Sequence, residues 1–263
     1  MDPRILLIEP FLRDLGKELR RTQVTRVRVK GPMDVVSALD IIAEDRVTRF
    51  LAEHFAGDSL LSEESAARVD YASRIWVLDP LDGTVNLTKG LPFAAISLAL
   101  LVDGSPVVGF IYDLFHDEMF SARAGEGAHC NHQPIHVTTG NVATIAVTTG
   151  VVRRLAARQP QQLVTLLTTC GKLRGLGAQA LQLAYVAAGR LTANISLETK
   201  LWDNAAGALL VKEAGGAYFN LDAIDPFPIG PGAPALLGAA DPCIAAAPTI
   251  LDAIRPLLEA LKD

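Results

Sequence analysis

Paired cysteines, excess positive charge and long apolar runs are missing from this sequence. Its three cysteines, Cys130, Cys170 and Cys243, are far apart, so they form neither a disulfide framework nor a paired metal motif. Lysine and arginine number 24 against 29 aspartates and glutamates, which disfavours nucleic-acid binding because that function usually needs a basic patch. The longest apolar run, Phe93 to Val102, is shorter than the ~20 residues that cross a bilayer. Without a signal-peptide pattern, we expect a cytoplasmic protein with no membrane or nucleic-acid partner.

The length and the order of the predicted elements indicate two fused halves. A chain of 263 residues is long enough for one large domain or two smaller ones, with a substantial buried core. Helical and strand patterns alternate along it, which is typical of layered α and β elements. We expect an N-terminal α+β half over residues 1–140 and a C-terminal α/β half over residues 141–263.

Hydrophobic spacing predicts individual elements within these halves. Residues 38–56 are expected to form a helix whose buried stripe is Ile41, Ile42, Val47, Phe50, Leu51 and Phe55. Residues 153–169 are expected to form one helix, and residues 236–239 a short strand.

The most informative stretch is Trp76-Val-Leu-Asp-Pro-Leu-Asp-Gly-Thr84. A buried strand is expected to end at Asp79, and Asp82 follows three residues later in a tight turn. Two carboxylates in such a turn repel each other unless a cation lies between them, and Mg²⁺ takes oxygen ligands of this kind. Gly83 allows close approach of the backbone to a ligand, and the amides of Gly83 and Thr84 could bind phosphate as a helix N-terminus does.

Two other readings of this stretch remain open at this point. Haloacid-dehalogenase phosphatases also place an aspartate before Asp-Gly-Thr, but one residue separates their two aspartates. Here Pro80 and Leu81 both intervene, which counts against a phospho-aspartyl intermediate. Alternatively, the aspartates only stabilise a turn and cap a helix.

Two further acids lie at the ends of predicted elements. Glu63, in Leu61-Ser-Glu-Glu-Ser65, follows a short apolar run, although an acidic pair in a loop is usually solvated surface. Asp203 stands where the helix Trp202-Asp-Asn-Ala-Ala-Gly207 would begin, a position that an ordinary N-cap would also explain.

Taken together, the acidic motifs resemble those of the inositol monophosphatase superfamily. The resemblance covers nearly the whole chain in the same order, and its segments are Ser62–Ser65, Asp79–Thr84, Gly125–Asn131, Trp202–Gly207 and Glu213–Gly216. It implies an αβαβα sandwich, usually dimeric, that hydrolyses small phosphate monoesters with Mg²⁺ and is often inhibited by Li⁺.

The resemblance also implies a ligand set for two or three Mg²⁺ ions. Glu63, Asp79 and the Leu81 carbonyl would hold the first ion. Asp79, Asp82 and Asp203 would hold the second, and Glu63 would share a weaker third. Two cations ~3.5–4 Å apart can stabilise the attacking and the leaving oxygen together, and phosphoryl transfer then needs mainly positioning and charge neutralisation.

Catalytic and substrate-binding roles follow from the same resemblance. Thr84 and Glu63 would orient the attacking water on the metal, and Asp40 would hydrogen-bond Thr84. Lys30 lies in a loop that usually closes over the site, although its alignment requires a one-residue gap. The expected substrate-binding residues are Asp82, Gly83, Thr84 and Asp203.

The chain departs from the family where inositol phosphate would be recognised. Ser196 stands where inositol-specific members carry a glutamate, and Glu198 could replace it only with a shifted loop. Ala178, Val151 and Val152 occupy places where hydroxyl side chains often stand. Since a site built to bind a hydroxyl rejects ligands that lack it, these losses indicate another or broader substrate. Inositol phosphate, histidinol phosphate, fructose 1,6-bisphosphate, a sugar phosphate and phosphoadenosine phosphate all remain candidates.

Two hypotheses of other kinds complete the set. The chain could be a regulatory binding protein on the same fold, since some bacterial relatives are said to act on transcription machinery. His129, His132 and His136 lie near Cys130, but their spacing fits no standard zinc motif and a surface turn explains them better.

Overall fold

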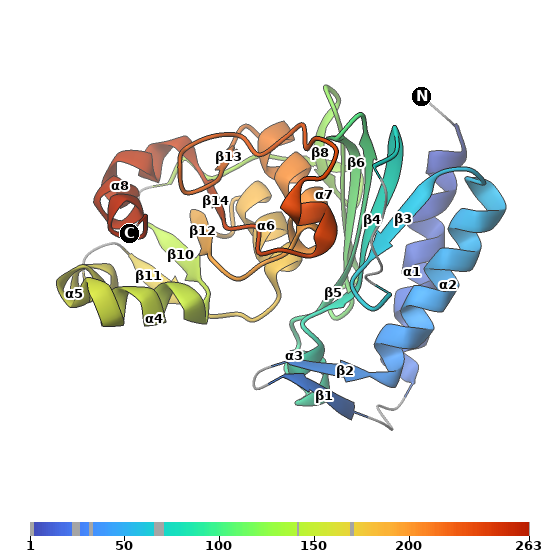
Figure 1. The fold of residues 1–263 in the computed structure, drawn as a ribbon, viewed down its shortest axis with the longest axis horizontal. Helices are drawn as coiled ribbons and strands as arrows, with labels where there is room; N and C mark the ends of the chain where they lie inside the picture. The colour runs from blue at the N-terminus through green and yellow to red at the C-terminus, as the bar shows by residue number, and fades with distance from the viewer. Residues whose placement is uncertain are drawn as a thin grey trace.

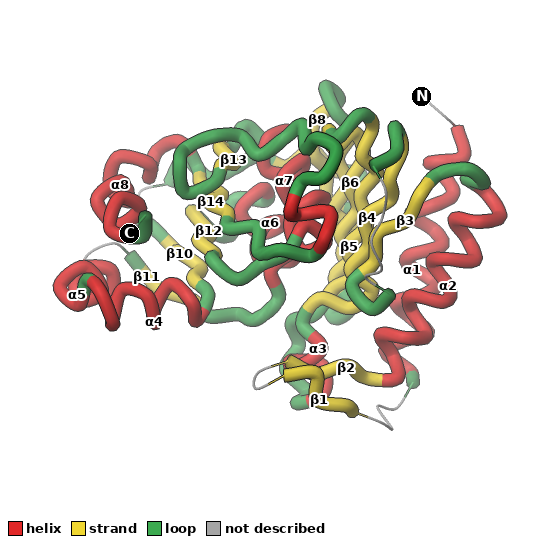
Figure 2. The backbone as a smooth tube through the Cα atoms, viewed as in Figure 1, coloured by secondary structure: helices red, strands yellow, loops and turns green. Residues whose placement is uncertain are grey.

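The computed structural model describes residues 3–22, 27–31, 34–65, 71–140, 142–168 and 171–262, with the backbone alone for residues 27–31, 34–36 and 237. Figure 1 shows the ribbon, and Figure 2 shows the same path coloured by secondary structure. The helices, with short 3₁₀ turns marked η, are η1 (Pro3–Leu7), α1 (Ile8–Arg21), α2 (Ala38–His54), α3 (Thr84–Thr88), α4 (Thr149–Arg158), α5 (Pro160–Thr168), α6 (Gln179–Ala187), α7 (Leu201–Glu213), η2 (Pro234–Leu237), η3 (Pro248–Ile250) and α8 (Leu251–Ala260). The strands are β1 (Val27–Gly31), β2 (Asp34–Ser37), β3 (Ser59–Ser62), β4 (Arg74–Asp82), β5 (Ala95–Val102), β6 (Ser105–Asp113), β7 (Glu118–Arg123), β8 (Gly127–Cys130), β9 (Gln133–Ile135), β10 (Thr144–Val147), β11 (Lys172–Arg174), β12 (Ala193–Ser196), β13 (Ala217–Phe219) and β14 (Cys243–Ala246).

These elements form five layers. Helices α1 and α2 cover the outer face of a seven-stranded sheet, β3-β4-β5-β6-β7-β8-β9. Helices α6 and α7 lie between this sheet and a five-stranded one, β11-β10-β12-β14-β13. Helices α4, α5 and α8 cover the far face of the second sheet, as Figure 1 shows. The arrangement confirms the αβαβα sandwich expected from the sequence.

The two inner helices carry most of the molecule's central core. Both faces of α6 and α7 pack against sheets, so their buried residues run around the helix and include Leu183, Leu210 and Val211. A helix that is apolar on all sides is expected when it is buried on all sides. The division into halves at residue 140 remains a prediction, although the seven-stranded sheet ends at Ile135 and the five-stranded sheet begins at Thr144.

Three predicted elements differ in the structure. In α2, Ile41 and Ile42 are 59% and 37% exposed, so placing them on the buried face was wrong. Val47 and Leu51 are buried as expected, and Leu39 and Ala43 complete the face in place of the isoleucines. These four recur every four residues and therefore share one face.

The predicted helix over 153–169 is two helices, because α4 ends at Arg158 and Pro160 begins α5. Proline lacks the amide hydrogen that a continuous helix requires and is favoured at a first helical position. The strand expected over 236–239 is also wrong. The first two residues of that segment belong to the 3₁₀ turn η2, and the strand of this region is β14, Cys243–Ala246.

Within the described residues, none of the helices combines the length and the apolar character that spanning a bilayer demands.

Candidate metal and phosphate site

Three aspartates from both halves of the chain meet at one point. Ligand oxygens of Asp79, Asp82 and Asp203 all lie within 4.8 Å of one another. Asp79 and Asp82 are at the end of β4, and Asp203 is in the first turn of α7. They line a cavity of about 180 Å³ together with Glu63, Leu81, Gly83, Thr84, Val85 and Gly177. The structure therefore brings together all five predicted metal-ligating residues.

A bulge in β4 presents the two aspartates on the same side. Asp79 pairs with Ser97 of β5, whereas Asp82 pairs with Ala95, so β4 contains one extra residue between the two pairs. Pro80 occupies this bulge, where its missing amide hydrogen costs no ladder hydrogen bond. The Asp79 carboxylate accepts a hydrogen bond from the Leu81 amide at 2.9 Å, which fixes the turn between them.

Gly83 is required where β4 turns into α3. Its φ of +86° lies in the left-handed region, and a Cβ atom there would come within 2.8 Å of the Phe93 carbonyl oxygen and 2.9 Å of the Ala178 Cβ. The absence of a side chain at Gly83 thus allows the loop before α6 to approach the turn that carries Asp79 and Asp82.

Asp82 joins the two halves through the first turn of α6. Its Oδ1 accepts a hydrogen bond from the Gln179 amide at 2.9 Å, and its Oδ2 accepts one from the Leu181 amide at 3.3 Å. A helix N-terminus offers free amide hydrogens and a favourable dipole to an anion. The α6 turn therefore orients Asp82 as well as partly neutralising it.

Asp203 is held by its own helix. Its Oδ2 accepts a hydrogen bond from the Lys200 amide at 2.6 Å, as a carboxylate at the third helical position of a capping box does. Lys200, not Asp203, is therefore the N-cap of α7, and Asp203 stabilises the helix start from the third helical position.

Burial and mutual repulsion raise the pKa of all three aspartates. Desolvation is the largest cause for each, and it raises the pKa of Asp82 to about 7 despite the α6 amide hydrogen bonds. The pKa of Asp79 is raised further by the negative charges of Glu63, Asp82 and Asp203, and that of Asp203 by the charge of Asp82. A cation between these carboxylates would offset both the desolvation and the repulsion, and would therefore lower the three pKa values. An all-oxygen, multiply charged donor set of this kind fits Mg²⁺.

Asp40 and Thr84 form the hydrogen bond that the resemblance implies. The Thr84 hydroxyl donates to Asp40 Oδ1 at 2.6 Å and also lies 2.9 Å from the Leu81 carbonyl oxygen. A hydroxyl has one proton, and the charged acceptor at the shorter distance attracts it more strongly. Asp40 Oδ2 accepts from the amide and hydroxyl of Ser37 at the start of α2, so its orientation is fixed.

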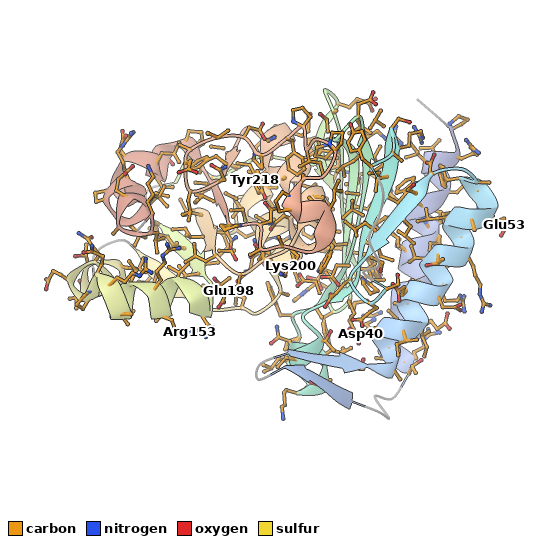
Figure 3. All side chains as sticks on the ribbon, in the orientation of Figure 1. Asp40, Glu53, Arg153, Glu198, Lys200 and Tyr218 are labelled. Atoms are coloured by element: carbon orange, nitrogen blue, oxygen red, sulfur yellow. The ribbon has the colours of Figure 1, made fainter. Side chains whose placement is uncertain are left out.

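Ser196 and Glu198, the two residues considered for the substrate side, are both engaged within the fold. Ser196 is fully buried in β12, so it does not reach a bound substrate. Glu198 accepts hydrogen bonds from the Gly150 amide at 2.9 Å and from Arg153 at 2.6 Å, and Figure 3 shows Glu198 and Arg153 near the start of α4. Glu198 thus joins the segment after β12 to the start of α4. The Lys30 side chain lies outside the described residues.

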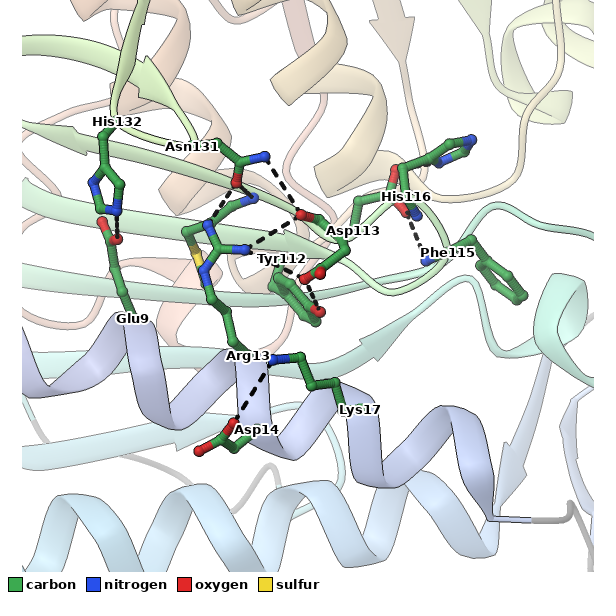
Figure 4. A network of polar contacts seen from close by, with 12 residues as sticks. Glu9, Arg13, Asp14, Lys17, Tyr112, Asp113, Phe115, His116, Asn131 and His132 are labelled. Carbon is green, nitrogen blue, oxygen red and sulfur yellow. Dashed lines mark hydrogen bonds and ion pairs between the residues drawn. The ribbon is translucent and has the colours of Figure 1, made fainter.

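The histidines form no metal centre in the part of the chain that the structure describes. The three aspartates are its one group of three or more His, Cys, Asp or Glu ligand atoms within 4.8 Å. Figure 4 shows His132 facing Glu9 of α1, with 3.6 Å between the His132 Nε2 and a Glu9 carboxylate oxygen. A larger cavity of about 540 Å³ borders this contact between α1 and strands β6–β8, and its lining shares no residue with the aspartate cavity.

Sequence reasoning missed the residues from α6. The amides of Gln179 and Leu181 bind Asp82, and Gly177 lines the cavity. A glycine shortly before a predicted helix was visible in the sequence, but nothing local linked this helix start to an aspartate in the other half.

Comparison with known proteins agrees with the geometry. The sequence matches the inositol monophosphatase family over residues 11–260. It is 36% identical to Nus factor SuhB of Pasteurella multocida, covering 77% of this chain and 78% of that protein. It is 35% identical to an inositol-1-monophosphatase of Mesorhizobium japonicum, covering 80% of this chain and 81% of that protein.

Solved structures agree with the sequence match. The Thermotoga maritima IMPase superposes with a TM-score of 0.83 at 26% identity, covering 99% of this chain and 98% of that one. An IMPase/NADP phosphatase solved with Mg²⁺ and phosphate superposes with a TM-score of 0.80 at 25% identity, covering 98% and 94%. With its aspartate cluster, five-layered fold and match over nearly its whole length, the chain belongs to the inositol monophosphatase family.

Proposed function

We propose that this protein hydrolyses a small phosphate monoester with Mg²⁺ held by Glu63, Asp79, the Leu81 carbonyl, Asp82 and Asp203. The observation that carries the proposal is that three aspartates, distant in the sequence, converge on one cavity. Their raised pKa values show that the charged carboxylates are unfavourable there without a cation. When bound, Mg²⁺ would neutralise the phosphate charge and lower the pKa of water.

The remaining residues of the cavity orient the reactants. Asp40 accepts the hydrogen bond that the Thr84 hydroxyl donates, so the lone pairs of the Thr84 oxygen are left to accept a hydrogen bond from the attacking water. Glu63 lies on the same cavity wall and would accept the second hydrogen of that water. The amides of Gly83 and Thr84, at the start of α3, would bind phosphate oxygens.

We infer that the substrate is not restricted to inositol phosphate. Ser196 is buried, Glu198 is bound to Arg153, and Ala178 has no hydroxyl, so none of these three side chains is available to select a particular alcohol. Histidinol phosphate, fructose 1,6-bisphosphate, phosphoadenosine phosphate and inositol 1-phosphate are therefore all to be tested.

The decisive experiment is phosphate release from this panel by the purified protein, first with Mg²⁺ and then with a chelator. Chelator-sensitive release from at least one compound supports the proposal and identifies the substrate class. No release from folded protein with Mg²⁺ in excess contradicts it for this panel. Adding Li⁺ to the active reaction tests the expected inhibition, and light scattering tests the expected homodimer.

A second candidate function is that of the SuhB relatives, which are named Nus factors. Salmonella typhimurium has a Nus factor SuhB that is 33% identical to this chain. Complementation of a Salmonella strain that lacks this SuhB, by wild type and by Asp79→Asn, separates the two functions. Rescue by both proteins would support a binding role that does not need catalysis, whereas no rescue by either would count against it.

A further inference from the structure

Four buried side-chain amides lie behind the aspartate site. This amide cluster consists of Gln179 and Gln182 on α6, Asn194 on β12 and Asn204 on α7. None of the four is more than 6% exposed. Burying amides is costly unless every donor and acceptor is satisfied, so apolar residues would fill this space at lower risk.

Gln179 is satisfied on both ends. Its Nε2 donates to Asn204 Oδ1 and to Cys243 Sγ, each at 3.2 Å. Its Oε1 accepts from Gln182 Nε2 and Asn194 Nδ2, also at 3.2 Å. Because both hydrogens of Nε2 and both lone pairs of Oε1 are used, the Gln179 side chain has one orientation available to it.

The cluster connects directly to the aspartates of both halves. The backbone amide of Gln179 donates to Asp82, and Asn204 is the residue after Asp203 in α7. The Gln179–Asn204 hydrogen bond therefore joins the helix that orients Asp82 to the helix that carries Asp203.

Asn204 is anchored on its other side as well. Its Nδ2 donates to the Asp241 carbonyl oxygen at 2.8 Å and to Thr199 Oγ1 at 3.2 Å. Thr199 immediately precedes Lys200, whose amide binds the Asp203 carboxylate. Asn204 thus fixes both the helix turn and the segment leading into it.

We propose that Gln179 and Asn204 are positioning residues that set the spacing between Asp82 and Asp203 and thereby the affinity for the divalent cation. The inference rests on the metal site of the proposed function. Neither side chain touches metal or substrate; each acts through the backbone to which a carboxylate is attached or hydrogen-bonded. Partners of this kind hold ligands in place and typically contribute 10–100-fold to metal affinity.

The test measures binding of Tb³⁺, with luminescence excited through Trp202 beside Asp203, and its displacement by Mg²⁺. Gln179→Met and Asn204→Leu keep the side-chain size but remove the hydrogen bond between them. We expect each to weaken Mg²⁺ affinity by roughly 10–100-fold, with turnover recovering at saturating Mg²⁺. Val211→Ala is the matched control, because it lowers stability by leaving a cavity in the same helix, far from Asp203.

The possible outcomes distinguish a failure of the positioning role from a failure of the proposed metal site. Wild type that binds neither Tb³⁺ nor Mg²⁺ would overturn the proposed metal site itself. If wild type binds Tb³⁺ and Mg²⁺, and the folded Gln179→Met and Asn204→Leu variants retain wild-type Mg²⁺ affinity, the positioning role alone is overturned. An equal loss of Mg²⁺ affinity in Val211→Ala would also overturn it. Should Gln179→Met fail to fold, Gln179→Asn keeps the amide but is too short for both sets of partners, and the same loss of affinity is expected.

Discussion

At the scale of single residues, Asp79 combines full burial with three negative neighbours. Its pKa is raised by desolvation and by Glu63, Asp82 and Asp203, so a neutral side chain of the same shape relieves repulsion in the metal-free protein. We expect Asp79→Asn to lower phosphate release by more than about 100-fold, the upper end for losing an outer partner of a ligand. Thermal unfolding in chelator should show unchanged or higher stability. A folded and fully active variant would contradict the metal assignment.

Thr84 offers a separate test of the attacking-water geometry. Thr84→Val keeps the shape but removes the hydroxyl that binds Asp40 at 2.6 Å. Since positioned proton-transfer groups contribute about 10²–10⁴-fold, kcat should fall in that range while Mg²⁺ affinity stays near wild type. Thr84→Ser retains the hydroxyl and serves as the control. Steady-state kinetics at saturating Mg²⁺ distinguish the two, and equal kcat values in both variants would exclude this role for the hydroxyl.

The acids of the site could be predicted from the sequence because each stands at the end of a recognisable element. Asp79 lies near the end of β4, which continues through the bulge to Asp82 and not only to Asp79 as expected, and Asp203 lies in the first turn of α7, ahead of small residues. Their hydrogen-bond partners could not be predicted in the same way. The amide of Gln179 reaches Asp82 from the other half of the chain, and no local pattern records a contact over that separation. The structure was also needed to show that Glu198 binds Arg153.

At the scale of elements, the contact between α6 and α7 determines how the site is assembled. Gly207 of α7 lies so close to α6 that a Cβ atom there would be 2.4 Å from the Leu183 Cβ. Because Cβ atoms are fixed to the backbone, the helices must move apart to admit one.

We therefore expect Gly207→Ala to lower the free energy of unfolding by about 1–3 kcal/mol, the usual cost of overpacking. Urea denaturation measures the change. Gly230→Ala is the control, since an added Cβ atom there meets nothing within 4 Å. Equal stabilities of the two variants would show that the helices separate at no cost.

Element prediction failed where tertiary position outweighed local pattern. Ile41 and Ile42 are hydrophobic, but the face of α2 that meets the sheet is set by Leu39, Ala43 and Val47. Helix ends were better indicated by proline than by hydrophobic spacing, as the break before Pro160 shows.

At the scale of the whole molecule, an ionic contact helps to join the layer of α6 and α7 to the seven-stranded sheet. Arg190, just after α6, donates two hydrogen bonds to Glu118 of β7, at 2.5 and 2.6 Å. This bond from Arg190 lowers the pKa of the Glu118 carboxyl below its usual value. A lowered carboxyl pKa gives stability that is present above the unfolded-state pKa, about 4.3 for glutamate, and that is lost as the pH falls through the folded-state pKa.

Arg190→Met should accordingly reduce stability at pH 7 by about 0.5–1 kcal/mol, since the pair is partly exposed. The difference from wild type should shrink below about pH 4. Arg123→Met is the control, because Arg123 pairs with Glu126 inside one hairpin at 3.6 Å. Urea titrations of each protein at neutral and acidic pH provide the comparison. A difference that stays constant with pH would assign the loss to packing over the Phe120 and Tyr185 rings.

The order of the layers along the chain also matters while the protein is being made. The seven-stranded sheet is complete at Ile135, yet α6 and α7, which cover its inner face, extend only from Gln179 to Glu213. At a synthesis rate of ~5–20 residues per second, the strands of this sheet emerge from the ribosome several seconds before helices α6 and α7. During that interval apolar strands such as β5 are open to other chains, which makes this the stage of synthesis most exposed to aggregation.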